Sequence, residues 1–158
     1  NFTQNGMVKN NIIYKTIEGI PSEKLFQELA NLYHYLFEDA DLKFFKQRSG
    51  EQLKALYVLA YNDKVLIGFK IGYPYNDNTF YSWVGGVHPK FRKQGIAKQL
   101  AKIQEDYAKN KGFSTLRTKS MNQFKPMMIL NLKNGFDITS IYTNTKGQTK
   151  IVFEKNIS

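Results

Sequence analysis

Apolar side chains recur along this chain at two spacings, one typical of helices and the other of strands. After the helix-start signal Pro21-Ser22, leucines stand at positions 25, 29, 32 and 36, which places them on one face of a helix. Runs rich in aromatic and β-branched residues, separated by turn residues such as Asn62-Asp63, indicate strands instead. The predicted order is a strand over 12–17, helices over 25–36 and 42–47, strands over 53–61, 64–73 and 79–87, a helix over 94–111, a strand over 113–121, a helix over 123–134, and strands over 136–143 and 148–155.

This order of elements predicts a single mixed α/β domain over residues 7–158. Ser49-Gly50 is expected to end the second helix, and Gly112 the third. No internal repeat or linker interrupts the pattern. Residues 1–6 are polar and precede Met7, so we expect a frayed terminus or added residues there.

The composition limits the classes of site that the chain can build. It contains no cysteine, which excludes disulfides, thiolate metal sites and a cysteine nucleophile. His34 and His88 are its two histidines, too few for a zinc site made of histidines alone, so we expect no metal. No apolar run approaches the roughly 18 residues of a membrane helix, and no signal-peptide pattern is present. We therefore expect a cytoplasmic protein without a membrane partner.

The charge balance points to two alternatives. The 23 Lys and Arg residues outnumber the 13 Asp and Glu residues, which gives a net charge of +10. Such a balance fits either a basic, well-solvated surface or an anionic partner, such as a phosphorylated cofactor or a nucleic acid.

The turn Arg92-Lys93-Gln94-Gly95-Ile96-Ala97, at the start of the third helix, is the strongest candidate for binding an anion. The first amide hydrogens of a helix have no internal partner, and the helix dipole places positive charge there. Gly95 lets a phosphate approach the backbone, and Lys98 adds charge further along. The chain has neither a P-loop nor a G-x-G-x-x-G dinucleotide fingerprint, so kinase and Rossmann-type interpretations lack support.

The strand before this turn ends in Gly85-Gly86-Val87. A glycine pair within a strand marks a bulge or a close approach of another backbone. If the sheet splays apart here, unpaired amide and carbonyl groups can bind an extended, amide-bearing ligand.

The segment Val87-His88-Pro89-Lys90-Phe91-Arg92-Lys93-Gln94-Gly95-Ile96-Ala97 resembles the [QR]-x-x-G-x-[GA] motif of the GNAT superfamily of acyl-CoA N-acyltransferases. Asn122 and the later Gly135-Phe136 resemble the second cofactor segment of that family, and the order of elements agrees over about residues 12–155. The resemblance implies a mostly antiparallel sheet, splayed in the middle, with helices on both faces and acetyl-CoA in the opening. The residues that would contact the cofactor are Val84, Gly85, Gly86, Val87, His88, Arg92, Lys93, Gln94, Gly95, Ile96, Ala97, Lys98, Asn122 and Asn131.

The same resemblance implies that an amine attacks the thioester directly, with catalysis resting on positioning and on a backbone amide that stabilises the oxyanion. Members of the family often place a tyrosine, as the general acid, where this chain has Asn131. An asparagine can donate a hydrogen bond to sulfur but cannot supply a proton. Asn131 and Asn122 are therefore the candidate catalytic residues, with Tyr142 or water as alternative acids.

The acceptor side carries no motif. The segment 80–84 offers no carboxylate as general base, although His88 could relay a proton or could simply end the strand. The candidate acceptor contacts, which could equally be solvated loop charges and core aromatics, are Glu38, Asp39, Asp41, Tyr81 and Trp83.

The sequence therefore predicts an acetyl-CoA-dependent N-acetyltransferase that acts on a primary amine of a small molecule, peptide or protein. Two alternatives remain open: a protein of the same fold that binds acyl-CoA without catalysis, and a basic nucleic-acid-binding module. No basic-aromatic run resembles a known RNA-binding motif, so we expect no nucleic-acid partner. GNAT-like domains often pair, which makes a homodimer a further expectation.

Overall fold

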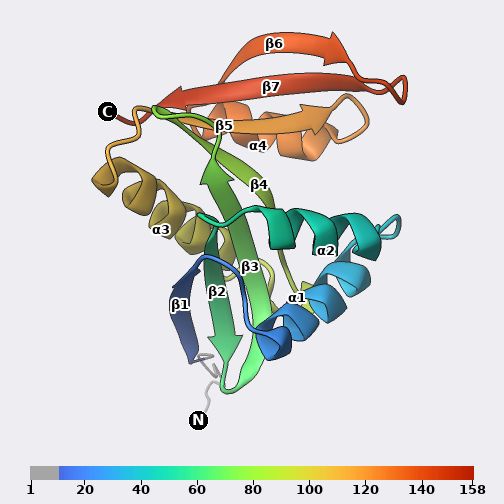
Figure 1. Cartoon of the computed structure of the whole chain (residues 1–158), viewed down its shortest axis with the longest axis vertical. Helices are drawn as coiled ribbons and strands as arrows, with labels where there is room; N and C mark the ends of the chain where they lie inside the picture. The colour runs from blue at the N-terminus through green and yellow to red at the C-terminus, as the bar shows by residue number, and fades with distance from the viewer. Residues whose placement is uncertain (1–10) are drawn as a thin grey trace.

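The computed structural model describes residues 11–158, which form a seven-stranded sheet with helices packed against it (Figure 1). The expectation about residues 1–6 lies outside the described residues. In chain order the elements are β1 (Ile12–Glu18), α1 (Glu23–Leu36), α2 (Leu42–Glu51), β2 (Leu56–Asn62), β3 (Val65–Pro74), β4 (Thr79–Val87), a short 3-10 helix (Pro89–Phe91), α3 (Ile96–Asn110), β5 (Thr115–Met121), α4 (Lys125–Lys133), β6 (Asp137–Thr143) and β7 (Thr149–Asn156).

The strands lie side by side in the order β1-β2-β3-β4-β5-β7-β6. Neighbouring strands run antiparallel, except that β4 and β5 run parallel. A parallel pair needs a crossover connection, and here α3 provides it. The predicted mixed α/β class with a mostly antiparallel sheet is confirmed.

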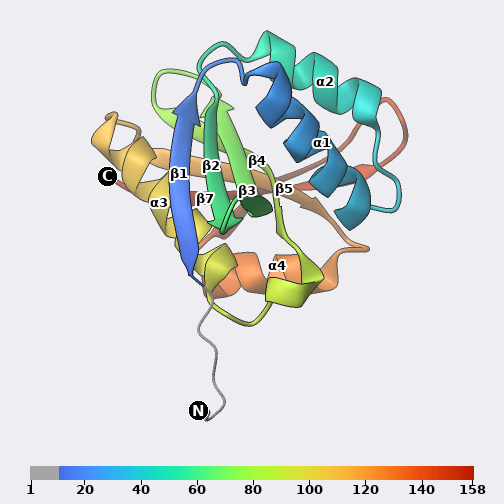
Figure 2. The same cartoon turned by 90° about the horizontal axis from the view of Figure 1, so that it is seen from below.

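The helices cover both faces of the sheet, as Figure 2 shows from below, with α1 and α2 on one side and α3 and α4 on the other. On the α1–α2 face, the sheet buries an aromatic cluster that includes Phe45, Tyr57 and Phe69. On the α3 face, Ile96 and Leu100 pack against the apolar residues of the sheet. The helix-start signal is also confirmed, because the Ser22 hydroxyl accepts the backbone N–H of Leu25 at 3.1 Å and caps α1.

The predicted end of the second helix at Ser49-Gly50 is wrong. α2 continues through both residues to Glu51, because it buries Phe45 and Ser49, which lie one turn apart against the core. A glycine inside a helix costs only about 1 kcal/mol, which such packing exceeds.

The third helix begins at Ile96 rather than at 94. Lys93 and Gly95 adopt φ angles of 63° and 78°, in the left-handed region, so neither can belong to a right-handed helix. The short 3-10 helix Pro89–Phe91, which the sequence did not predict, fills part of the connection from β4.

No helix within residues 11–158 is long and apolar enough to cross a bilayer.

Candidate functional site

The central strands β4 and β5 pair over only three residues each and then separate. Thr79–Tyr81 pair with Thr115–Arg117, and just beyond them the Thr118 hydroxyl donates to the Ser82 carbonyl at 3.1 Å. Further along, β4 stays paired with β3 as far as Val87, whereas β5 pairs with β7. The sheet is therefore splayed in the middle, and among residues 11–158 the far half of β4 has no strand partner along one edge.

The glycine pair in β4 reflects close approach rather than a bulge. The β3–β4 register shift leaves out Trp83, because Ile71 pairs with Val84 and Gly72 pairs with Ser82. A Cβ on Gly86 would come within 2.7 Å of Leu36 Cδ1 at the end of α1. Glycine at this position lets α1 lie directly on the strand.

A tightly held turn joins β4 to α3. The backbone N–H of His88 donates to the Ile67 carbonyl at 2.7 Å, and His88 Nδ1 accepts the N–H of Lys90 at 3.1 Å. Arg92 Nε donates to the Val87 carbonyl at 3.2 Å, so this guanidinium ties the turn to the end of the strand. The His88 ring stacks on Tyr35, with centroids 5.0 Å apart. Two of the predicted cofactor residues, His88 and Arg92, therefore also hold the turn in place through contacts within the protein.

The first turn of α3 fits an anionic group. Its N-cap, Gly95, has no side chain, so no capping bond from this residue covers the first backbone N–H groups of the helix. A Cβ on Gly95 would meet no atom within 4 Å, which means that open space lies over this residue. Lys93 and Lys98 are exposed on either side, whereas Ile96 is buried and anchors the turn.

The two predicted asparagines have different environments. Asn122 is exposed in the turn after β5, where its carbonyl accepts Lys125 Nζ at 2.5 Å. Asn131 is only 8% exposed, and it is the one buried residue of α4. Its side-chain nitrogen Nδ2 has no hydrogen-bond partner among residues 11–158. A buried donor without a partner is costly, which marks Asn131 as a donor available to a bound group.

The predicted acceptor residues Tyr81 and Trp83 lie on β4 where it begins to separate from β5, and other elements add aromatic and cationic side chains there. Tyr73 packs edge-on against both rings, at 5.4 Å from Tyr81 and 6.2 Å from Trp83. We call the whole group the aromatic–cationic cluster, which consists of Arg48, Tyr73, Tyr81, Trp83, Lys119 and Tyr142.

Sequence reasoning missed Arg48, Tyr73 and Lys119. The pairing of Tyr73 with Tyr81 could have been predicted from the sequence, because the loop of the β3–β4 hairpin sets the register of the two strands. Arg48 on α2 and Lys119 on β5 carry no sequence signal, because only the tertiary fold brings them to β4.

The predicted acidic residues lie outside this cluster. The Asp41 carboxylate accepts the N–H of Phe44 at 2.9 Å and caps α2. Glu38 and Asp39 are exposed on the loop between α1 and α2.

A tyrosine phenol is neutral at physiological pH, and the environment of Tyr81 disfavours its ionisation further. Burial raises the pKa of Tyr81 well above its ordinary value, and the neighbouring Tyr73 raises it further. Arg48 and Arg117 act in the opposite direction without reversing the shift. Tyr81 therefore offers a hydroxyl donor at physiological pH.

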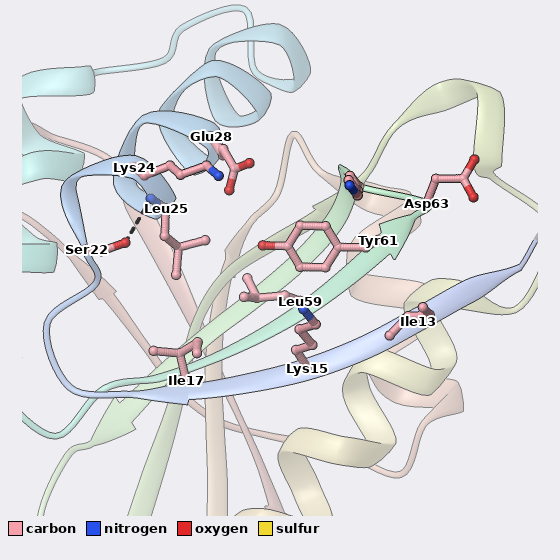
Figure 3. A pocket seen from close by; sticks show the side chains of 11 residues that line it. Ile13, Lys15, Ile17, Ser22, Lys24, Leu25, Glu28, Leu59, Tyr61 and Asp63 are labelled. Carbon is pink, nitrogen blue, oxygen red and sulfur yellow. Dashed lines mark hydrogen bonds between the residues drawn. The ribbon is translucent and has the colours of Figure 1, made fainter.

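Two hollows lie elsewhere on the molecule. One, of about 410 Å³, lies between β1, β2 and α1, where Lys15, Glu28 and Tyr61 line it (Figure 3). The other, of about 360 Å³, is lined by Tyr35, His88 and residues of α1 and β3. Neither includes Gly95 or Asn131, so neither is the splayed opening. Within the described residues no group of three His, Asp or Glu side chains could hold a metal ion.

Comparison with known proteins identifies the family of the fold. Residues 22–135 match the profile of the Acetyltransferase (GNAT) family. A search among curated proteins gave no match.

Three solved structures illustrate the structural likeness. A GNAT family acetyltransferase from Elizabethkingia anophelis with acetyl-CoA bound is 24% identical, with a TM-score of 0.72 over 94% of this chain and 99% of that chain. The ribosomal-protein-S18-alanine N-acetyltransferase of Escherichia coli is 18% identical, with a TM-score of 0.73 over 92% and 95%. The aminoglycoside 6'-N-acetyltransferase of Enterococcus faecium is 14% identical, with a TM-score of 0.74 over 92% and 97%. At these identities the likeness establishes a shared fold.

Proposed function

The chain belongs to the GNAT acetyltransferase family, and on that premise we propose that it transfers the acetyl group of acetyl-CoA to a primary amine. The observation that carries the proposal is the combination of the splayed β4 edge with the open, uncapped turn at Gly95. These two features continue one another along the chain, since β4 leads through the turn into α3. An extended thioester with a diphosphate at one end suits a strand edge followed by a helix N-terminus.

The individual residues divide the binding task. Backbone groups of Val84 to Val87 would pair with the amides of the cofactor arm. The amide hydrogens from Gly95 onward would hold its diphosphate, with Lys93 and Lys98 supplying fixed positive charge. Arg92 would act indirectly, because its hydrogen bond to the Val87 carbonyl holds the turn in place.

The co-substrate supplies an acetyl thioester, whose leaving group is a thiol, and a free thiol such as that of cysteine has a pKa near 8.5. Because such a thiolate leaves with modest help, a hydrogen bond from Asn131 Nδ2 can replace the proton of a stronger acid. The main task left to the protein is to position a neutral amine against the carbonyl carbon.

Calorimetric titration of acetyl-CoA, followed by a thiol-release assay with a panel of amines, tests the proposal. We expect saturable binding at sub-millimolar acetyl-CoA and release of one thiol for each acetylated amine. Binding without turnover of any amine would favour a protein that holds acyl-CoA without catalysis. Absence of binding would remove the proposal altogether.

A further inference from the structure

We infer that the acceptor is an amine whose own molecule carries an oxyanion, a carboxylate or a phosphate, which the aromatic–cationic cluster binds. This inference rests on the proposed function and names the class of its second substrate.

The first binding group is the Arg48 guanidinium. It lies against three rings, with its central carbon 4.7 Å from the Phe44 centroid and 5.6 Å from the Trp83 centroid, and it donates to the Tyr73 hydroxyl at 2.5 Å. No carboxylate in residues 11–158 lies within ion-pair distance of it. Arginine has five N–H donors, and one bond to Tyr73 leaves donors available for a ligand.

The second binding group is the Lys119 ammonium on β5. It lies 5.5 Å from the ring centroid of Tyr81 and 5.3 Å from that of Tyr142. Across the described part of the chain it too has no acidic partner. By contrast, the nearby Arg117 has an acidic partner, because it forms an ion pair with Glu154 at 2.6 Å.

The two cations share one site because of how the strands diverge. Tyr81 and Arg117 form the last paired positions of β4 and β5. Trp83 and Lys119 each lie two residues further along, on the strands that have just separated. Arg48 reaches Trp83 and Tyr73 from α2, while Lys119 contacts Tyr81, which packs on Tyr73. Two unpaired cations and an aromatic wall therefore line the acceptor side of the opening.

This arrangement selects against a purely cationic acceptor. Two uncompensated positive charges beside partly buried rings repel an ammonium group and attract an oxyanion. The oxyanion would compensate both cations, and the neutral phenol of Tyr81 can donate to it as well.

Trp83 provides a direct test, because it is the only tryptophan of the chain and belongs to the cluster. Its fluorescence can be followed while N-acetylalanine or N-acetylalaninamide is added to the full chain, which compares a carboxylate with its neutral amide. Phosphoethanolamine and ethanolamine form the corresponding pair for phosphate. We expect the anionic member of at least one pair to bind about tenfold tighter, with an affinity that falls as salt is added.

Variants test whether a preference for the anionic ligand arises from the aromatic–cationic cluster. Lys119→Met and Arg48→Met should each reduce the preference to about threefold or less, while Arg48→Lys should retain part of it. Lys109→Met, which removes an exposed lysine at the end of α3, is the matched control and should retain the full preference. The acetyl-CoA affinity of every variant is measured in parallel, so that a folding defect is recognised.

The outcomes separate the two proposals. Equal binding of the two members of each pair by a chain that binds acetyl-CoA would overturn this inference alone, and so would a preference that survives both methionine variants. Failure to bind acetyl-CoA would instead overturn the proposed function. A preference for the carboxylate pair or for the phosphate pair identifies the source of the oxyanion.

Discussion

Lys70 and Gly85 face each other across the β3–β4 hairpin, and the missing side chain of Gly85 makes room for the lysine. A Cβ on Gly85 would lie 3.2 Å from Lys70 Cγ and 2.9 Å from the Phe69 carbonyl oxygen. Lys70 is partly buried, and burial lowers its pKa from 10.5 to about 8. The glycine pair, whose two residues are predicted cofactor contacts, therefore also has a packing function within this chain.

Gly85→Ala should destabilise the protein more than Gly86→Ala. The new methyl group at position 85 meets backbone, whereas at position 86 it meets the end of the flexible Leu36 side chain. Overpacking against backbone costs about 1–3 kcal/mol, and a leucine side chain can rotate away. Chemical denaturation of both variants measures the difference. An equal or reversed order would contradict the close approach at Gly85.

Lys70→Met should raise the melting temperature near neutral pH. In the unfolded chain the lysine keeps its ordinary pKa of 10.5, while in the folded chain the pKa is about 8, so folding disfavours the charged form. As the pH rises from about 8 to 10.5, the folded state loses this proton first, and the wild type gains stability relative to the variant. Melting curves over this range check the prediction, with Lys109→Met as an exposed control. A constant difference between wild type and Lys70→Met would be inconsistent with the lowered pKa.

Gln104→Met should stabilise the fold. Gln104 lies on α3 with 0% exposure, and among the described residues neither its side-chain oxygen nor its nitrogen has a hydrogen-bond partner. An unsatisfied buried amide costs about 1–3 kcal/mol, which a methionine of similar shape avoids. We expect a gain of about 1 kcal/mol in the free energy of unfolding, with acetyl-CoA affinity unchanged. A clear loss of stability would show that the amide is satisfied by groups such as bound water.

Asn131→Leu should lower turnover without lowering the stability of the fold. Because Nδ2 makes no hydrogen bond within residues 11–158, the melting temperature should stay the same or rise. Loss of a donor to the leaving sulfur should lower kcat about tenfold, with little change in acetyl-CoA affinity. Asn134→Leu, three residues later at the exposed end of α4, is the control. Unchanged kcat in Asn131→Leu would exclude a catalytic hydrogen bond from this residue.

Local signals in the sequence predicted much of this fold. The predicted bounds of β4 agree with the observed strand, because Pro89 and the polar loop before Thr79 mark the two ends of a run that contains three aromatic residues. The α1 cap followed from Ser22, whose hydroxyl has the expected bond. Such features depend on residues close in sequence, which is why pattern alone finds them.

Features that depend on tertiary contacts were harder to predict from the sequence. On α3, Gln104 and Ala108 are fully buried, while the apolar Ile103 and Tyr107 are partly buried and pack against the same core. Gln104 lies against Gly72, whose missing side chain leaves space for the amide. Similarly, Tyr81 and Trp83 were among the predicted acceptor contacts, but the cations that lie against them, Lys119 and Arg48, come from two other elements and were not predicted. Charge complementarity at that site could only be judged once the elements were placed.

The central claim is that the turn at Gly95 binds the diphosphate of acetyl-CoA, and a calorimetric comparison of two variants tests it most directly. Gly95→Asn and Gly95→Asp add side chains of nearly equal size at a residue with φ of 78°, a conformation that both tolerate better than most residues. The two therefore differ mainly in charge. If the diphosphate lies on this turn, Gly95→Asp should bind acetyl-CoA about tenfold or more weakly than Gly95→Asn, since a carboxylate would lie beside it. Equal affinities of the two variants for acetyl-CoA would contradict the placement of the cofactor.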